Sequence, residues 1–252
     1  MYQLFDFAYF RDFETSIQKL AGMAMAEPWS FSNEPTNSFS ILKNYLEHTF
    51  RRLKFEDKIK KSSDNQSVCF NTGLMTPNYS YIFAFFETNK NTGATNPYFF
   101  KAFFSESDLS FVKHFSELPE PAYFFADPSL FVYNHILPIQ LNVDHIVDDN
   151  IDRFPQNIKD NRDMCRRLLS GAIEETKKRL RANYKIAVPH CYDNKVQLLI
   201  PIYLTGSFDT PDLALAIEKN RDRYYAITCL TMRMAYQNAR LIVKPESSWL
   251  HA

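Results

Sequence analysis

Hydrophobic residues recur at three- and four-residue steps in the stretch 38–60, a spacing that places them along one side of a helix. This stripe consists of Phe39, Leu42, Leu46, Phe50 and Leu53. A similar spacing over residues 12–25, before Pro28, predicts an earlier helix, because proline cannot continue the helical hydrogen-bond pattern. The first part of the chain is therefore expected to supply two amphipathic helices.

Between residues 68 and 142 the pattern changes to runs of aromatic and β-branched residues separated by polar turns. The stretches 68–74 and 79–87, joined through Pro77 and Asn78, predict a hairpin. Further strands are expected at 98–104, 123–133 and 134–142, with a short helical turn at 111–115. Pro138 favours an edge position for the strand 134–142, because proline cannot donate to a neighbouring strand.

The last part of the chain predicts a long helix followed by an antiparallel meander. The helix spans 159–183, with Met164, Leu168, Ala172 or Ile173, and Leu180 on one face. Strands are expected at 185–191, 196–204, 213–219 and 224–230, and a closing helix at 231–241. Short connections require antiparallel pairing. We therefore predict an α+β fold, a largely antiparallel sheet with flanking amphipathic helices, formed as one domain over residues 1–252.

Composition supports a globular, cytoplasmic protein. Phe at 23 and Tyr at 14 are abundant and predict a core or groove built from flat rings. Four widely spaced cysteines lack metal-ligand spacing and are interpreted as free thiols in a reducing compartment. The sequence shows neither a signal-peptide pattern nor about 18 consecutive apolar residues, so no membrane association is expected.

Charge is balanced overall but unevenly distributed along the chain. The formal net charge is zero, yet residues 51–61 carry six basic and two acidic side chains, and residues 162–181 carry seven and three. Residues 117–152 lean acidic. Basic runs can contact phosphates, although such a run is often only the solvated face of a helix. Arg52 and Arg166 represent the two basic segments as candidate phosphate contacts.

Sequence signatures of catalysis are few. Phosphate-binding, dinucleotide-binding, serine-hydrolase and zinc-protease motifs are absent. His145 and its neighbouring aspartates could hold a divalent ion, but an acidic surface turn explains the same residues. No metal site and no cofactor are therefore predicted. His190 and Cys191 cannot form a dyad, because adjacent strand residues face opposite ways.

Two small motifs supply the remaining candidate ligand-binding residues. Asn71, Thr72 and Gly73 combine polar side chains with a glycine that permits close backbone approach, although ordinary turn chemistry explains the same letters. Near the end of the chain, Tyr236 and Arg240 share one helical face, and Asn238 points away from it. A ring beside a guanidinium suits base stacking with phosphate pairing, and equally an internal cation–π contact.

The chain resembles an uncharacterised bacterial domain family through stretches that occur in order along nearly its whole length. These are FDFAYF (5–10), ILKNYLEHTFRRLKFEDKI (41–59), FNTGL (70–74), LLIPIYL (198–204), DLALAIEKN (212–220) and MAYQNARLIVKPESSWL (234–250). The resemblance implies an association with RNA, since relatives look like RNA-associated proteins, some of which carry cold-shock or other RNA-binding modules in the same polypeptide. Arg233 stands where the family pattern implies Asp, and His190 where it implies Gln.

Three functions remain open from the sequence. The leading hypothesis is an RNA- or nucleotide-binding module, in which the basic helices contact phosphates and exposed rings stack on bases. The second is an enzyme that hydrolyses or modifies a nucleotide or RNA phosphate ester, with Asn71, Thr72 and Arg240 orienting phosphate and His190 or Glu218 transferring a proton. The third is a protein–protein interaction domain with an exposed aromatic patch.

Overall fold

The computed structural model describes residues 3–91, 93–206 and 209–251, which group into two compact units. Unit 1 comprises Met1–Tyr123 and unit 2 comprises Phe124–Ala252. Each unit combines helices with a mostly antiparallel five-stranded sheet, which confirms the α+β fold class. A single domain over 1–252 stays a prediction, and each unit is described by itself.

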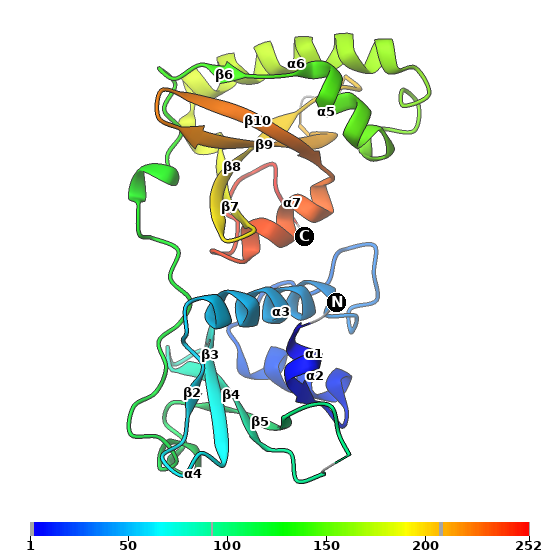
Figure 1. Cartoon of the computed structure of the whole chain (residues 1–252). Helices are drawn as coiled ribbons and strands as arrows, with labels where there is room; N and C mark the ends of the chain where they lie inside the picture. Colours follow the sequence, from blue (N-terminus) through cyan, green and yellow to red (C-terminus); the bar gives the residue numbers. More distant parts are fainter. Residues whose placement is uncertain (1–2, 92, 207–208, 252) are drawn as a thin grey trace. The chain divides into compact units, whose positions relative to one another are not determined.

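The sheet of unit 1 has the strand order β1-β5-β4-β3-β2 (Figure 1). Its strands are β1 (Ala8–Tyr9), β2 (Lys60–Lys61), β3 (Ser67–Met75), β4 (Tyr81–Thr88) and β5 (Tyr98–Ser105). β3 and β4 pair as the predicted hairpin, and β4 pairs antiparallel with β5. β1 runs parallel to its neighbour, β5, whereas the other described pairings of this sheet are antiparallel. The helices of this unit are α1 (Gln3–Phe7), α2 (Phe13–Met23), α3 (Ser40–Phe55) and α4 (Leu109–Val112).

α3 forms because its predicted apolar stripe is buried against the sheet. Leu42, Phe50 and Leu53 have no exposed surface. The Phe50 ring contacts Phe70 of β3 at 5.5 Å between centroids, and Phe70 in turn stacks on Phe86 at 5.6 Å. Ring pairs of this kind add to the hydrophobic gain from burial. The aromatic excess in the composition therefore builds a core.

Local signals shift both predicted N-terminal helices by a few residues. Asp12 accepts a hydrogen bond from the Thr15 backbone N–H and so caps α2, which begins at Phe13. α3 ends at Phe55 and not near residue 60, because Asp57 adopts a left-handed conformation, φ 54°, that cannot continue a helix. The predicted helical turn at 111–115 lies at 109–112 as α4 and packs its Phe111 on the other face of the sheet.

Unit 2 contains a second sheet with the order β6-β10-β9-β8-β7. Its strands are β6 (Ile139–Gln140), β7 (Val188–Tyr192), β8 (Lys195–Ile202), β9 (Leu213–Asn220) and β10 (Arg223–Leu230). The helices are α5 (Val143–Asn150), α6 (Arg162–Ala182) and α7 (Met232–Arg240), with short 3₁₀ turns at Pro128–Leu130, Ile151–Arg153 and Tyr184–Ile186. The four-stranded meander β7 to β10 and both flanking helices confirm the sequence prediction.

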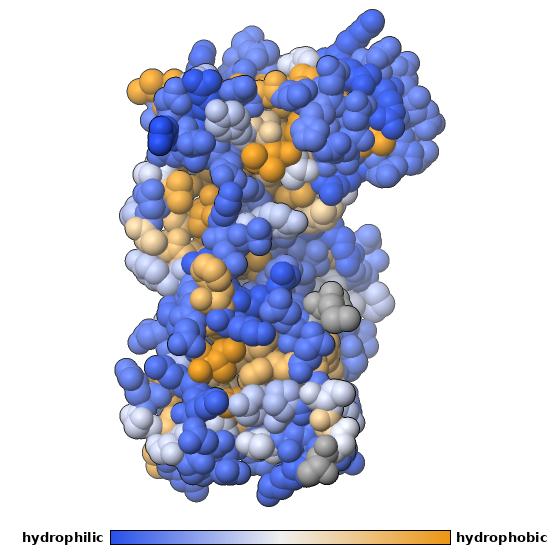
Figure 2. Space-filling model, viewed as in Figure 1, coloured by the Kyte–Doolittle hydropathy of each residue, from blue (hydrophilic) through white to orange (hydrophobic). Residues whose placement is uncertain are grey.

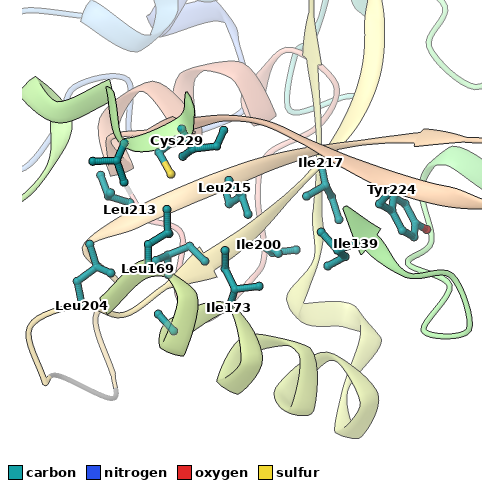
Figure 3. Close-up of a cluster of buried hydrophobic side chains, with 14 of the residues drawn as sticks. Ile139, Leu169, Ile173, Ile200, Leu204, Leu213, Leu215, Ile217, Tyr224 and Cys229 are labelled. Carbon is teal, nitrogen blue, oxygen red and sulfur yellow. The ribbon is translucent and has the colours of Figure 1, made fainter. Parts of the chain in front are cut away.

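The two faces of this sheet carry different helices. α6 covers one face, where Leu169 and Ile173 meet Ile200 and its neighbours in a fully buried core (Figure 3). Side chains at alternate positions, such as Gln197 and Leu199, point to the other face. α7 contacts β7, β9 and β10 and lies on the side of the sheet opposite α6 (Figure 1).

Sequence prediction and structure differ in four details between residues 123 and 182. The stretch 123–133 is not a strand, because Asp127 caps a 3₁₀ turn that begins with Pro128. The strand 134–142 is reduced to β6, an edge strand as Pro138 indicated, but parallel to β10. Residues 143–150 form α5, capped by Asn142, where no helix was predicted. The buried face of α6 includes Cys165 and Leu169, one residue beyond the predicted positions.

The tight turn between β7 and β8 agrees with its sequence. Asp193 and Asn194 have φ values of 47° and 61°, the left-handed pair typical of a two-residue hairpin. No described helix has the length and apolarity that crossing a lipid bilayer requires. All four cysteines are free and buried.

Candidate nucleic-acid interface

Asn71 and Thr72 are buried and Gly73 is half-buried, and the triplet forms an irregular bulge within β3. Thr72 has no exposed surface, and its hydroxyl donates to the Ile82 carbonyl at 2.6 Å. Gly73 has φ 73°, and a Cβ added to it would lie 2.7 Å from the Tyr45 hydroxyl oxygen. That hydroxyl donates to the Thr72 carbonyl at 2.8 Å. The glycine is therefore required by packing, and the Thr72 hydroxyl and carbonyl are both engaged in hydrogen bonds inside the fold.

Asn71 connects this bulge to a distant part of unit 1. Its Oδ1 accepts a hydrogen bond from the Gly73 N–H at 2.9 Å, and its Nδ2 donates to the Pro119 carbonyl at 3.3 Å. Asn71 is almost fully buried. It therefore fastens the start of the segment 119–123.

The end of the same segment is held by a clamp formed by Arg52, Glu56 and Lys58. The Glu56 Oε2 accepts from the Tyr123 backbone N–H at 3.1 Å, and the Arg52 Nη2 donates to the Tyr123 carbonyl at 2.9 Å. Arg52 and Glu56 also pair with each other. Lys58 Nζ lies 2.8 Å from a Glu56 carboxylate oxygen and donates to the Pro121 carbonyl at 2.8 Å. Both backbone polar groups of Tyr123 are thus fixed by charged side chains.

The charge state of Glu56 suits this role. Burial by itself would raise the pKa of Glu56, but the hydrogen bonds from Lys58, Arg52 and the Tyr123 N–H outweigh it. The pKa of Glu56 therefore lies below its ordinary value. The carboxylate stays ionised at neutral pH and keeps all three interactions.

Two exposed aromatic rings lie at this clamp, and we name them the aromatic platform. Phe55, at the end of α3, is 68% exposed, and Tyr123 is 53% exposed. The Arg52 guanidinium carbon lies 5.6 Å from the Phe55 centroid, and Lys58 Nζ lies 5.9 Å from the Tyr123 centroid. Both rings are therefore flanked by cations within cation–π range.

Further basic residues lie close to Phe55 in the sequence, on α3 and β2. The exposed side chains of Arg51, Lys54, Lys60 and Lys61 form no ion pair within the described ranges. Arg51 and Phe55 are four residues apart and share one face of α3. The face drawn in Figure 2 is largely hydrophilic, with hydrophobic residues in separate patches. A cationic surface with two exposed rings has the composition of a single-stranded nucleic-acid site.

The guanidinium of the candidate Arg166, in unit 2, forms ion pairs with three carboxylates. Its guanidinium lies 2.7 Å from Asp144, 3.0 Å from Asp148 and 3.0 Å from Asp163. Arg162 also pairs with Asp148, at 2.6 Å. The basic start of α6 is thereby neutralised by α5. Within the described residues, no three metal-ligating side chains cluster here or elsewhere.

His190 is buried in β7 opposite Gln197 of β8. Neither ring nitrogen has a hydrogen-bond partner among the described residues. Burial lowers the pKa of His190 to about 4. The Gln197 amide donates to Glu218 at 2.8 Å. His190 is therefore neutral at physiological pH and closed to solvent.

The three candidates on α7 differ in exposure. Tyr236 is buried, whereas Asn238 and Arg240 are partly exposed. A buried ring cannot stack on a base in this arrangement, so the predicted stacking role of Tyr236 has no support here. Tyr236 packs on the α7 side of the sheet, whereas Arg166 belongs to α6 on the opposite side.

Of the nine candidates, Arg52 and Asn71 act on the same segment, residues 119–123. Thr72 and Gly73 serve the fold of unit 1, and the others lie in unit 2. Sequence reasoning missed Phe55, Glu56 and Tyr123. One signal for Phe55 was available, because it is an aromatic residue outside the apolar stripe of its helix.

A sequence profile described as "Domain of unknown function (DUF3825)" matches residues 20–249, and the chain belongs to this family. The match spans most of unit 1 and nearly all of unit 2. This confirms the predicted membership of an uncharacterised domain family. No curated protein and no solved structure matches the chain.

Proposed function

We propose that the chain binds single-stranded RNA through the aromatic platform of unit 1. The observation that carries this proposal is the clamp, which uses three charged side chains to hold an exposed tyrosine in place. An exposed ring held at its backbone loses little conformational entropy when a base stacks on it. Because every base has a flat face, such stacking tolerates many sequences.

The basic residues of the segment 51–61 would supply the second part of the interaction. Arg51 and Lys54 lie on the last turns of α3 beside Phe55, and Lys60 and Lys61 follow in β2. These cations can contact the phosphates that join the stacked nucleotides. Binding should therefore weaken steeply as salt is raised, since each phosphate contact releases a counterion.

A phosphate-ester enzyme receives less support. Asn71 and Thr72, which that hypothesis needs as phosphate ligands, are buried and engaged in internal hydrogen bonds. His190 is closed to solvent. A reducing, cytoplasmic setting remains part of the proposal and fits the four buried free thiols.

The proposal is tested by fluorescence anisotropy with a labelled single-stranded RNA at two salt concentrations. Phe55→Ala should weaken binding by about 5- to 150-fold, which corresponds to about 1–3 kcal/mol for one lost base stack. Tyr192→Ala, which removes a ring of similar exposure (63%) from unit 2, serves as the control and should change affinity less than twofold. Equal affinity of the two variants, or binding that is independent of salt, would refute the platform. Recovered RNA should run intact on a denaturing gel.

A further inference from the structure

Unit 2 contains a cavity of about 510 Å³ that the proposed RNA site does not use. One wall is the stretch 183–189, which leads into β7, and the other is the stretch 243–248 that follows α7. Its volume lies within the range of small-molecule binding sites. The cavity therefore has room for a ligand of nucleotide size.

The second wall is held in place by the end of the chain. Trp249 is buried and its Nε1 donates to the Ile186 carbonyl at 2.8 Å, which ties the tail to the first wall. Leu250 is buried beside it in sequence. This anchoring fixes the two walls relative to each other without closing the space between them.

The lining combines flat apolar surfaces with positive charge. Pro189 and Pro245 face the cavity from opposite walls, and Val243 on the tail is 53% exposed although it is apolar. Lys185 lines the cavity from one wall and Lys244 from the other, and both side chains lack an ion-pair partner within the described stretches of the chain. Apolar walls suit a planar ring, and two unpaired ammonium groups suit an anion.

The remaining polar groups narrow the class of ligand. Glu246 contributes a carboxylate acceptor, and Ser247, Ser248 and Asn183 contribute hydroxyl and amide groups. A carboxylate disfavours a purely anionic ligand but can accept hydrogen bonds from hydroxyl or amino groups. A ligand with a planar ring, hydroxyl groups and one phosphate satisfies all three kinds of surface.

We propose that this cavity is a binding site for a nucleoside monophosphate, with the phosphate at Lys185 and Lys244 and the base between the walls. The site is independent of the aromatic platform, since all its lining residues belong to unit 2. Nucleotide binding in this cavity therefore does not depend on whether unit 1 binds RNA.

Isothermal titration calorimetry of the whole chain with adenosine, guanosine, cytidine and uridine 5′-monophosphates tests the site. Lys185→Glu and Lys244→Glu should each weaken binding at least about fivefold, because charge reversal places repulsion beside the phosphate. Lys178→Glu, the same change at an exposed position of α6, is the matched control and should bind within twofold of the unaltered chain. Inorganic phosphate and unphosphorylated nucleosides, titrated separately, should each bind more weakly than the complete nucleotide.

Two outcomes would overturn the assignment. The first is the absence of binding for all four nucleotides at millimolar concentration. The second is binding that neither Lys185→Glu nor Lys244→Glu changes; loss of that binding in Phe55→Ala would then assign the nucleotide to the platform. The RNA affinity of both lysine variants is measured as well. If it is unchanged, loss of nucleotide binding concerns only this cavity and leaves the proposed RNA binding by unit 1 intact.

Discussion

His190 should make the stability of unit 2 sensitive to mild acid. Its pKa is about 4 in the folded chain, against an ordinary value of 6.5 that applies after unfolding. Between these two values the unfolded state binds more protons than the folded state, so stability rises with pH and falls as pH is lowered. The contribution is fully present above pH 6.5 and is lost progressively as pH falls through 6.5 toward 4.

The size of the effect follows from the gap between the two pKa values. The full gap corresponds to about 3 kcal/mol, and lowering the pH from 7.5 to 5 should cost about 2 kcal/mol of that. His190→Gln removes the titrating group while keeping a polar side chain opposite Gln197. The variant should therefore lose about 2 kcal/mol less than the original chain over the same pH interval.

The two tryptophans allow unit 2 to be followed by itself. Trp29 belongs to unit 1 and Trp249 to unit 2, and both are buried. In a Trp29→Phe background, urea unfolding followed by Trp249 fluorescence at pH 7.5 and 5 reports unit 2. Carboxylates also titrate in this pH range, but their contribution to the free energy of unfolding is the same in both proteins. Comparison with His190→Gln in the same background therefore removes it. Identical pH dependence in the two proteins would refute the burial argument for His190.

Two further predictions concern unit 1. Gly73→Ala should destabilise it by about 1–3 kcal/mol in urea unfolding, because the residue has positive φ and a Cβ would press on the Tyr45 hydroxyl; Gly93→Ala, which meets nothing closer than 3.6 Å, should cost far less, and equal losses would contradict this account. Glu56→Gln should weaken binding of single-stranded RNA about two- to tenfold by loosening Tyr123, with a circular dichroism spectrum unchanged. Full RNA affinity in that variant would show that the clamp does not organise the platform.

The sequence predicts well wherever one periodic pattern is long enough to dominate. The stripe from Phe39 to Leu53 and the alternating strands of the meander give α3 and β7 to β10 within a few residues. The aromatic stretch 123–133 misleads for a physical reason. Rings favour strands only where neighbouring strands can pair with them, and this stretch begins with Tyr123, whose backbone groups bond to side chains.

The candidate site was harder to predict, because polar residues carry the same letters in structural and functional roles. From the sequence, Asn71 and Thr72 are plausible ligand-binding residues, but in the structure their side chains form hydrogen bonds inside the fold. Conversely, Glu56 and Tyr123 are 67 residues apart, so no local pattern could join them. Phe55 is the exception, because an aromatic residue off the apolar stripe of its helix can be recognised from the sequence.

The four buried cysteines allow the opening of each unit to be measured by the rate at which their thiols are labelled. Burial raises the pKa of Cys69, in unit 1, and raises that of Cys229, in unit 2, to about 12, so almost no thiolate is present in the closed state. A thiol reagent can then modify these positions only during excursions that expose them. Mass spectrometry of the modified peptides over time would therefore rank the rates at which the two units open transiently. The natural cysteines serve as probes, so none needs to be introduced.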